Sequence, residues 1–241
     1  KKVDKFIIAE ATKDQGRKEK KLNFKIENFL KFKDKINYLV INDLPVQVSS
    51  PKKGWHENHM RDQFQRNALE RGYRDFDDED LIMISDIDEI PNPKKIKDFN
   101  IENKYACFLQ KNYQSKINLL NITEGNWAGT KICKKKYLKS PQWLRNIKTK
   151  KKPFWKIFNK EIQLINDGGW HFSFLKDPSS IRNKIVSYSH QEYNKEEFTD
   201  INLIKQKITK GEDLFSRKIK YEKVEVDQSF PNYITENKST S

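Results

Sequence analysis

Two aspartates follow an apolar run in the first half of the chain, and their spacing lets them bind one cation. The run covers residues 81–84, and Asp86 and Asp88 come after Ser85, with Ile87 between them. Because alternate side chains of an extended chain point to the same side, both carboxylates can face one ion. Carboxylate oxygens suit Mg²⁺ or Mn²⁺, and such ions usually keep several waters and take further ligands from substrate phosphates. The pattern therefore predicts a metal site at a strand end and a nucleoside diphosphate in the substrate.

Three apolar runs upstream of Pro93 have the pattern of buried strands. They cover residues 3–11, 36–41 and 81–84, and the clearest helical spacing between them lies in residues 56–71. Continuous apolar runs are typical of strands buried on both faces of a parallel sheet. Strands that alternate with helices predict an α/β fold whose functional edge lies at the carboxyl ends of the strands. Glu10, Asp43 and the two aspartates all lie at these ends.

The second half of the chain has a different pattern. Residues 105–122 and 126–136 look like strands of mixed or antiparallel type, with a tight approach expected at residues 127–130. Strands are expected at 162–165 and 170–174, a turn at 166–169, and helices at 179–189 and 199–209. The prediction is a mostly parallel sheet flanked by helices, with a smaller mixed sheet.

The size and composition of the chain predict one globular domain. Its 241 residues suffice for one sizeable core, and no linker rich in proline, glycine or serine interrupts them. Aromatic residues make up 12% of the chain, which is too many for a disordered protein. We therefore expect a single domain at residues 1–235 and a frayed tail at 236–241, which has no apolar anchor.

The sequence also carries signals that bear on location. No apolar stretch reaches the roughly 18 to 20 residues that span a bilayer, and no signal-peptide pattern follows the basic N-terminus. Cys107 and Cys133 are the only cysteines, and their spacing predicts neither a disulfide framework nor a zinc site. These features favour a reducing, cytoplasmic location. A lumenal location is the alternative if the chain is a fragment of a membrane-anchored enzyme.

The chain is strongly basic, with a formal net charge of +14 and an isoelectric point near 9.5. Such a balance attracts nucleic acids, anionic membranes and acidic glycans. The lysines, however, are scattered along the whole chain, and only residues 134–136 and 148–152 form clusters. We expect no nucleic-acid partner, because clustered arginines with interleaved aromatic residues are absent. The clusters are assigned at most a peripheral contact with a membrane or a phosphorylated or membrane-bound acceptor.

Five segments carry motifs that occur in the same order in one enzyme family. They are Val-Asp-Lys-Phe-Ile-Ile-Ala-Glu-Ala at 3–11, Arg-Asn at 66–67, Ser-Asp-Ile-Asp-Glu-Ile-Pro at 85–91, Gly-Trp-His-Phe-Ser at 169–173 and Ser-His-Gln-Glu at 189–192. From Val3 to about Tyr233 the chain resembles glycosyltransferase family 17, the β-1,4-mannosyl-glycoprotein β-1,4-N-acetylglucosaminyltransferases and their microbial relatives. The resemblance implies a GT-A-like, Rossmann-like nucleotide-sugar transferase that is metal-dependent and inverting and uses UDP-N-acetylglucosamine (UDP-GlcNAc).

Two departures from the family pattern affect this interpretation. Family members usually have a further strand and helix before the segment that corresponds to residues 3–11, with a Phe-Asn-Glu-like motif expected to touch the nucleotide. That segment either lies upstream of the printed chain or has been lost, and its loss would remove donor contacts. In addition, residues 12–21 are charged and lack the family's usual Phe-Ser-Gly sequence.

The implied transfer needs a cation that neutralises the leaving diphosphate. Asp86 and Asp88 are the expected ligands of Mn²⁺ or Mg²⁺, one bound directly and the other either bound directly too or acting through water or the donor ribose. His171 is a candidate third ligand or a hydrogen-bond partner of the diphosphate. The alternative for His171, and for His190 near the end of a predicted helix, is a structural role.

The transfer also needs a carboxylate that deprotonates the acceptor hydroxyl. Asp167 is the first candidate, because the flanking glycines Gly168 and Gly169 let the backbone come close to a substrate. Its alternative role is a simple turn with Gly168. Glu192 and Glu124 are the other candidates, and the sequence does not separate the three.

Contacts to the donor are expected from Glu10, Arg66, Asp86 and Gly129. Arg66 follows an apolar helical stripe and can reach phosphates with its planar guanidinium, although an ion pair with Asp62 explains it equally well. Trp127 and Trp170 are the expected platforms for sugar rings, with core packing as the alternative.

Three other functions stay open at this point. The same fold can accept another nucleotide sugar, such as UDP-glucose. The chain can be an inactive sugar-nucleotide binder. A basic nucleic-acid-binding module, in which the two aspartates are structural, is the alternative from a different class.

Overall fold

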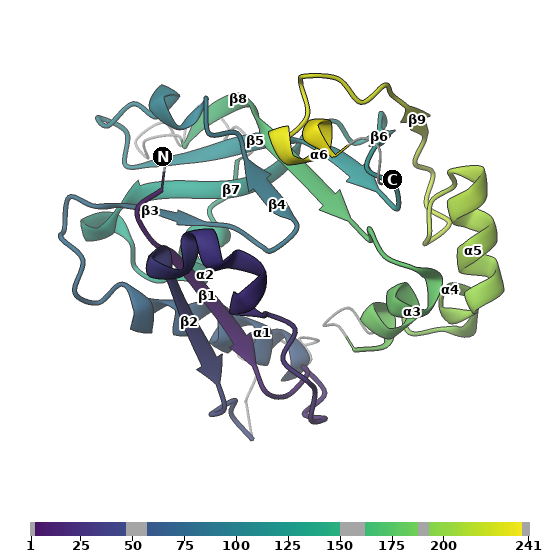
Figure 1. Ribbon diagram of the computed structural model, residues 1–241, viewed down its shortest axis with the longest axis horizontal. Helices are drawn as coiled ribbons and strands as arrows, with labels where there is room; N and C mark the ends of the chain where they lie inside the picture. Colours follow the sequence, from purple (N-terminus) through teal and green to yellow (C-terminus); the bar gives the residue numbers. More distant parts are fainter. Residues whose placement is uncertain (1–2, 47–56, 150–161, 188–192, 238–241) are drawn as a thin grey trace, which may run out of the picture.

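The computed structural model describes residues 3–46, 57–149, 162–187 and 193–237 of the chain (Figure 1). The strands are β1 (Phe6–Ala11), β2 (Ile36–Ile41), β3 (Leu81–Ile84), β4 (Glu89–Pro91), β5 (Tyr105–Gln114), β6 (Leu119–Asn121), β7 (Trp127–Lys134), β8 (Gln163–Ser173) and β9 (Tyr221–Lys223). The α-helices are α1 (Glu57–Asn67), α2 (Pro141–Arg145), α3 (Pro178–Ser187), α4 (Glu196–Thr199), α5 (Ile201–Lys210) and α6 (Asn232–Glu236). Short 3₁₀ segments are η1 (Ile26–Lys35), η2 (Ala68–Gly72), η3 (Ile96–Asp98) and η4 (Lys135–Tyr137). The α/β class is therefore as predicted.

The main sheet is antiparallel at most of its strand pairs, so the prediction of a mostly parallel sheet is wrong. In this seven-stranded sheet β3, β7, β5, β6 and β9 follow one another, and β8 pairs with both β5 and β4. The β5–β8 pair is parallel, whereas β3–β7, β5–β7, β5–β6, β4–β8 and β6–β9 are antiparallel. β1 and β2 form a separate parallel pair, with Phe6 opposite Ile36 and Ala11 opposite Ile41.

The error arises because a continuous apolar run reports burial on two faces and not strand direction. Ile82 and Ile84 of β3 are buried in one core cluster with Tyr73, Cys133 and Leu144. β3 reaches this cluster as the antiparallel neighbour of β7. The sequence of β3 would look the same in a parallel sheet.

The expected common edge of strand ends is divided between the two sheets. Ala11 and Ile41 close β1 and β2 and pack with Ala68 in a small core of their own. Glu10 therefore lies at the end of the two-stranded sheet, while the aspartates follow β3 in the main sheet. Asp43 forms a two-pronged ion pair with Arg71, its Oδ2 2.7 Å from Nη2.

The predicted turn at residues 166–169 is an irregular stretch inside one continuous strand, β8. Gly168 and Gly169 are pressed between neighbouring strands, and the register with β5 shifts between Phe108 and Gln110. A Cβ atom at Gly168 would lie 2.7 Å from the backbone nitrogen of Leu109, and one at Gly169 would lie 2.1 Å from the carbonyl oxygen of Ile90. Gly169 also has φ of +137°, which only glycine adopts readily. The two glycines thus permit close strand pairing and do not end the strand.

The helices α3, α4 and α5 gather beyond the carboxyl end of β8, at the right of Figure 1. Ile181, Ile185 and Ile204 form their shared core with Leu214 and Phe215. The helix expected at 199–209 is α5, which begins at Ile201 because Asp200 caps it by accepting a hydrogen bond from the backbone N–H of Leu203, and α4 ends just before it at Thr199. α1 likewise gives way to η2 within the helix expected at 56–71.

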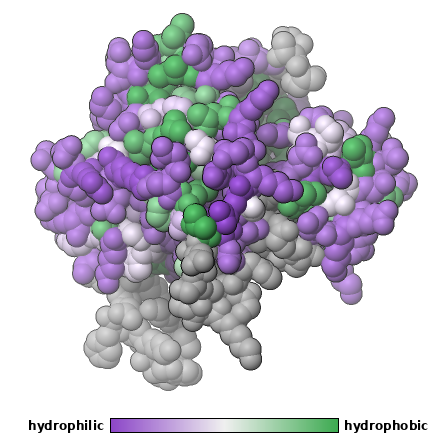
Figure 2. Space-filling view, turned by 90° about the horizontal axis from the view of Figure 1, so that it is seen from below, coloured by the Kyte–Doolittle hydropathy of each residue, from purple (hydrophilic) through white to green (hydrophobic). Residues whose placement is uncertain are grey.

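The surface is mainly hydrophilic on the face shown in Figure 2, with several separate hydrophobic groups. Within the described ranges, no helix is both long and apolar enough to cross a membrane. Cys107 and Cys133 are free thiols and fully buried. The single-domain assignment to residues 1–235 stays a prediction, and most of the expected tail lies outside the described residues.

Candidate active site

Asp86 is held by two arginines at the end of β3. Its Oδ1 accepts hydrogen bonds from Arg66 Nε and Nη2 at 3.3 and 3.0 Å, and its Oδ2 accepts from Arg145 Nε and Nη2 at 3.3 and 3.1 Å. Burial alone would raise the pKa of Asp86, but the two guanidinium groups outweigh burial and lower it. Asp86 is therefore an ionised carboxylate whose two oxygens are both engaged by protein donors.

The two arginines come from helices that the chain folds beside β3. Arg66 lies in the last turn of α1 and also pairs with Asp62 at 3.1 Å, which is the ion pair considered as its alternative role. Its contact with donor phosphates stays a prediction. Arg145 ends α2, a short helix that begins with Pro141 and is capped by Ser140, whose Oγ accepts from the N–H of Trp143.

A buried lysine fixes the end of α2. Lys131 on β7 is 3% exposed, and its Nζ donates to the carbonyl oxygens of Arg145 and Ile147 at 2.5 and 2.7 Å. Burial lowers the pKa of Lys131 to about 8, which is the expected cost of taking an ammonium group out of water. Lys131 thus positions the backbone from which Arg145 reaches Asp86.

Glu89 is a buried carboxylate that contacts Arg145, Trp127 and the backbone of Asp86. Its Oε1 accepts from Arg145 Nη2 at 2.9 Å and from Trp127 Nε1 at 2.8 Å, and its Oε2 accepts from the backbone N–H of Asp86 at 3.2 Å. Burial raises the pKa of Glu89, and Arg145 offsets only part of this effect. The side chain therefore ties Arg145, Trp127 and the strand end together.

Asp88 faces an imidazole at a distance too long for a hydrogen bond. Its Oδ1 lies 3.8 Å from His171 Nε2, and its Oδ2 lies 3.5 Å from Lys184 Nζ on α3. His171 comes from β8, where it lies opposite Glu89 of β4. The pairing of β4 with β8 therefore brings the Asp-X-Asp and Gly-Trp-His motifs together.

The neutral form of His171 directs a lone pair toward Asp88. His171 Nδ1 lies 2.9 Å from Asn112 Oδ1, and a carbonyl oxygen can only accept, so Nδ1 carries the proton. Burial lowers the pKa of His171, and the charges of Lys184 and Arg145 lower it further against the opposing effect of Asp88. Asp88 Oδ1 and His171 Nε2 therefore both present lone pairs to the space between them and lie 3.8 Å apart.

This pair fits part of a cation site. A ligating histidine usually donates its other ring N–H to an oxygen, as His171 does to Asn112. Within the described ranges, no three side chains of His, Cys, Asp or Glu come together as a complete metal site. Mg²⁺ and similar ions do not need one, because they commonly bind one or two protein ligands together with water and phosphates. Asp88 and His171 match that requirement.

Trp127 covers the imidazole. Its ring stacks on His171 with the centroids 4.5 Å apart and an interplanar angle of 12°, and it is 37% exposed. Trp170 instead points to the other face of β8, where it packs with Tyr113 and Phe172 and donates from Nε1 to the carbonyl of Ser229. Of the two expected sugar platforms, only Trp127 lies beside the aspartates.

Glu10 anchors a loop. Its carboxylate accepts from Lys20 Nζ at 2.6 Å, from the N–H and side chain of Asn23, from the N–H of Phe24 and from the hydroxyl of Tyr38. Burial acts to raise its pKa, but these hydrogen bonds lower it to about 2. The five donors account for the side chain without a ligand.

Gly129 is packed against a side chain of the neighbouring strand. A Cβ atom there would lie 1.9 Å from Gln110 Oε1, so the tight approach expected at residues 127–130 is one between β7 and β5. Gly129 lies fully buried, and nothing in its surroundings assigns it to a donor.

The candidate bases lie in different parts of the molecule. Asp167 lies in the irregular stretch of β8, four residues before His171, and its φ is +50°. Glu124 lies on the loop between β6 and β7, three residues before Trp127, and accepts from Asn121 Nδ2 at 2.9 Å. Glu192 and His190 lie outside the described residues.

The sequence alone did not identify Arg145, Glu89, Lys131, Asn112 or Lys184 as residues of the site. Ser140 and Pro141 are a helix-start signal that would have placed Arg145 in a helix. Its partner Asp86 is 59 positions away, so no local pattern links them. The same separation joins Asn112 to His171.

Comparison with known proteins identifies a family. The family described as "Glycosyltransferase family 17" matches residues 1–221 of the 241. No curated protein and no solved structure matches the chain.

Proposed function

The chain belongs to glycosyltransferase family 17, and from this premise we propose that it moves N-acetylglucosamine from UDP-GlcNAc to a hydroxyl of a glycan with inversion. Membership of the family implies a sugar donor and an acceptor. The observation that supports a metal-dependent mechanism best is the Asp88–His171 pair, in which two lone-pair donors face each other without a hydrogen bond.

Asp88 and His171 would hold Mn²⁺ or Mg²⁺, and the ion would supply positive charge beside the diphosphate of the donor. Asp86 has a supporting part in this proposal, because Arg66 and Arg145 already engage both of its oxygens. Held in this way, Asp86 fixes the strand end from which Asp88 projects.

Lys184 is a second source of positive charge at the same place. Its Nζ lies 3.5 Å from Asp88, and α3 carries it to the site from beyond the end of β8. An ammonium group suits a phosphate as a point charge. In the proposed complex Lys184 neutralises a diphosphate oxygen as the bond to the sugar breaks.

Glu124 is the candidate base that the geometry favours among the described residues. An inverting transfer requires a carboxylate on the acceptor side, within hydrogen-bond reach of the attacking hydroxyl. The loop that carries Glu124 leads directly into Trp127, which stacks on His171. Asp167 lies in the irregular part of β8, before His171, and Glu192 stays a prediction.

The test is UDP release from UDP-GlcNAc, compared with UDP-glucose and UDP-galactose, with Mn²⁺ and after treatment with EDTA. We expect Mn²⁺-dependent release that is fastest with UDP-GlcNAc and increases when a glycan acceptor is added. Faster release from UDP-glucose would mean that the proposed donor is wrong, while the proposed reaction class, glycosyl transfer, would stand. Absence of both UDP release and a thermal shift with any of the three nucleotide sugars would contradict the proposal.

A further inference from the structure

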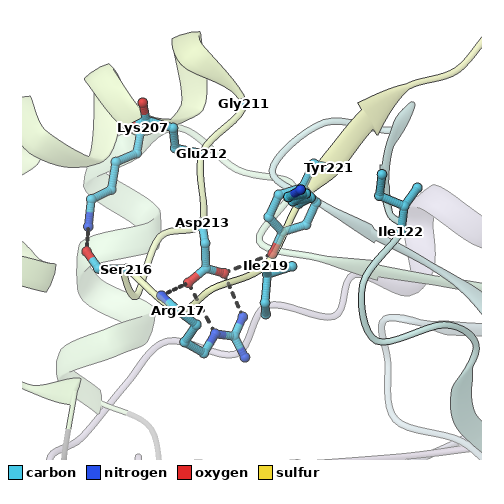
Figure 3. A pocket seen from close by; sticks show the side chains of 10 residues that line it. Ile122, Lys207, Gly211, Glu212, Asp213, Ser216, Arg217, Ile219 and Tyr221 are labelled. Carbon is cyan, nitrogen blue, oxygen red and sulfur yellow. Dashed lines mark hydrogen bonds and ion pairs between the residues drawn. The ribbon is translucent and has the colours of Figure 1, made fainter.

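A solvent-open cavity of about 540 Å³ lies between α5, β9 and the loop after β6 (Figure 3). Ile122 and Ile219 contribute apolar surface to its lining, and the polar groups come from Lys207, Glu212, Asp213, Ser216, Arg217, Lys220 and Tyr221. A volume of this size is in the range of small-molecule sites. The cavity lies outside the Asp88–His171 site and has no part in the mechanism above.

The polar lining of the cavity is held rigidly. The Asp213 side chain is 2% exposed and accepts from Arg217 Nη2 at 2.7 Å, from Arg217 Nε at 3.1 Å and from the Tyr221 hydroxyl at 2.9 Å. The backbone N–H groups of Phe215 and Arg217 also donate to it. Arg217 and Tyr221 are therefore fixed before any ligand arrives, as Figure 3 shows.

One strand connects this cavity to the candidate cation site. The Oε1 atom of Gln114 on β5 lies 2.8 Å from the Tyr221 hydroxyl, and its Nε2 lies 3.5 Å from Asp213 Oδ1. Asn112, which orients His171, lies two residues earlier on β5 and so on the same face, about 7 Å away. The cavity is thus adjacent to the site on the side away from Asp86.

The loop between β6 and β7 bridges the two places. Ile122 at its start lines the cavity, and Trp127 after its end stacks on His171. Glu124 lies between them, and its charge acts to raise the pKa values of both Arg217 and Tyr221. The candidate base is therefore on the loop that joins the wall of the cavity to Trp127.

We propose that this cavity binds the acceptor sugar, a neutral pyranose at the end of the glycan, which rests on the proposed function. Isoleucine side chains suit the C–H faces of a sugar ring, and the guanidinium of Arg217 and the exposed carboxylate of Glu212 suit vicinal hydroxyls. The charged side chains of the lining nearly cancel, because Lys207, Arg217 and Lys220 are countered by Glu212 and Asp213. This leaves little net attraction for a free phosphate and favours a neutral polyhydroxy ligand. The acceptor hydroxyl then points toward Glu124 and the donor.

The test fills the cavity from its exposed wall. Ile122→Trp changes a side chain that is 51% exposed, and Ile101→Trp is the matched control at 54% exposure on a distant loop. The probes are the methyl β-glycosides of N-acetylglucosamine, mannose and galactose. We measure the KM of each glycoside in transfer and, separately, UDP release without an acceptor.

Ile122→Trp should raise the KM of the preferred glycoside about tenfold or more, because a filled cavity excludes the ring, and should change acceptor-free UDP release less than about twofold. Ile101→Trp should change neither quantity. An unchanged KM in Ile122→Trp, or an equal loss of acceptor-free release, would overturn the cavity assignment.

Saturation-transfer NMR with the same glycosides separates this inference from the proposed function. If the wild type releases no UDP, the proposed function fails, while glycoside binding that Ile122→Trp abolishes still supports the cavity. Binding that both tryptophan variants retain, or no binding to the wild type, contradicts it.

Discussion

The carboxylates at the ends of β1 and β3 have opposite surroundings. Glu10 accepts five hydrogen bonds from the loop and strand around it. Asp88 has Lys184 at 3.5 Å and His171 at 3.8 Å among its described neighbours. Both come at the end of an apolar run and look alike in the sequence. The number and length of their contacts separate a residue that holds the fold from one that has oxygen lone pairs available for an ion.

The largest expected effect comes from removing the charge of Asp88. Asp88→Asn should lower turnover about 10³-fold, because an ion at the leaving group stabilises the transition state by several kcal/mol. It should also abolish the rise in melting temperature that Mn²⁺ causes in the wild type. Glu10→Gln is the matched control and should keep turnover within about twofold of the wild type when both are folded. If Glu10→Gln lowered turnover more than Asp88→Asn did, Glu10 and not Asp88 would be the functional carboxylate.

The next effect concerns the acceptor side. Glu124→Gln should lower kcat about 10²-fold, because a general base contributes roughly this factor or more, and should leave donor binding intact. Asp167→Asn is the control, and its kcat should stay near that of the wild type. A loss confined to Asp167→Asn would move the base to β8 and would separate it from Trp127.

Glu10 should contribute to stability instead of turnover. Glu10→Gln should lower the free energy of unfolding at pH 7 by about 2 kcal/mol, because the charged carboxylate matches its donors. The pKa of Glu10 in the folded protein is about 2, below its ordinary value of 4.5, so protonation favours unfolding. Its contribution should therefore be complete above pH 4.5 and disappear as the pH falls toward 2.

Urea unfolding of the wild type and Glu10→Gln across this pH range measures that difference. Glu27→Gln, an exposed change in η1, is the control and should be close to neutral at every pH. A gap between wild type and Glu10→Gln that stays constant from pH 7 to pH 2 would assign the loss to shape and not to charge.

The smallest effect sharpens the role of the arginines. Lys131→Met should lower the free energy of unfolding by about 1 to 2 kcal/mol, since two carbonyls at the end of α2 lose their donor. Removing a buried charge offsets part of this loss. The donor KM should rise as Arg145 loses its fixed position. Lys223→Met, on exposed β9, should change neither value.

The sequence was sufficient for features that depend on neighbouring residues. Three such features are local patterns: the two aspartates after the apolar run of β3, the amphipathic stripe of α3 and the family motifs. The structure contains the strand before Asp86 and Asp88 and the helix α3. Strand direction was not local. β3 pairs with β7 through residues about 50 positions apart, and β5 meets β8 in parallel across a similar gap. Such choices depend on loop closure and on competition among strands, which no short window records.

The candidate site was predictable only in part for the same reason. The sequence placed Asp88 and His171 in one hypothesis through the family motifs, and the β4–β8 pairing does bring them within 3.8 Å. It gave no reason to expect that two guanidinium groups engage Asp86, or that Trp170 points away from Trp127. Alternate residues of β8 face opposite sides of the sheet, so Trp170 faces away from His171 and Trp127. The sequence alone does not show which side is which until one residue of the strand has been assigned to a face.

Gly168 and Gly169 have a consequence for how this enzyme can vary. They set the spacing of β8 against Leu109 on one side and Ile90 on the other, three and two residues before His171. A methyl group at either position would force the strands apart and carry the imidazole away from Asp88. Two glycines, which carry no functional group, therefore control the distance between the proposed metal ligands Asp88 and His171. We expect these two positions to tolerate substitution less well than many charged residues on the surface.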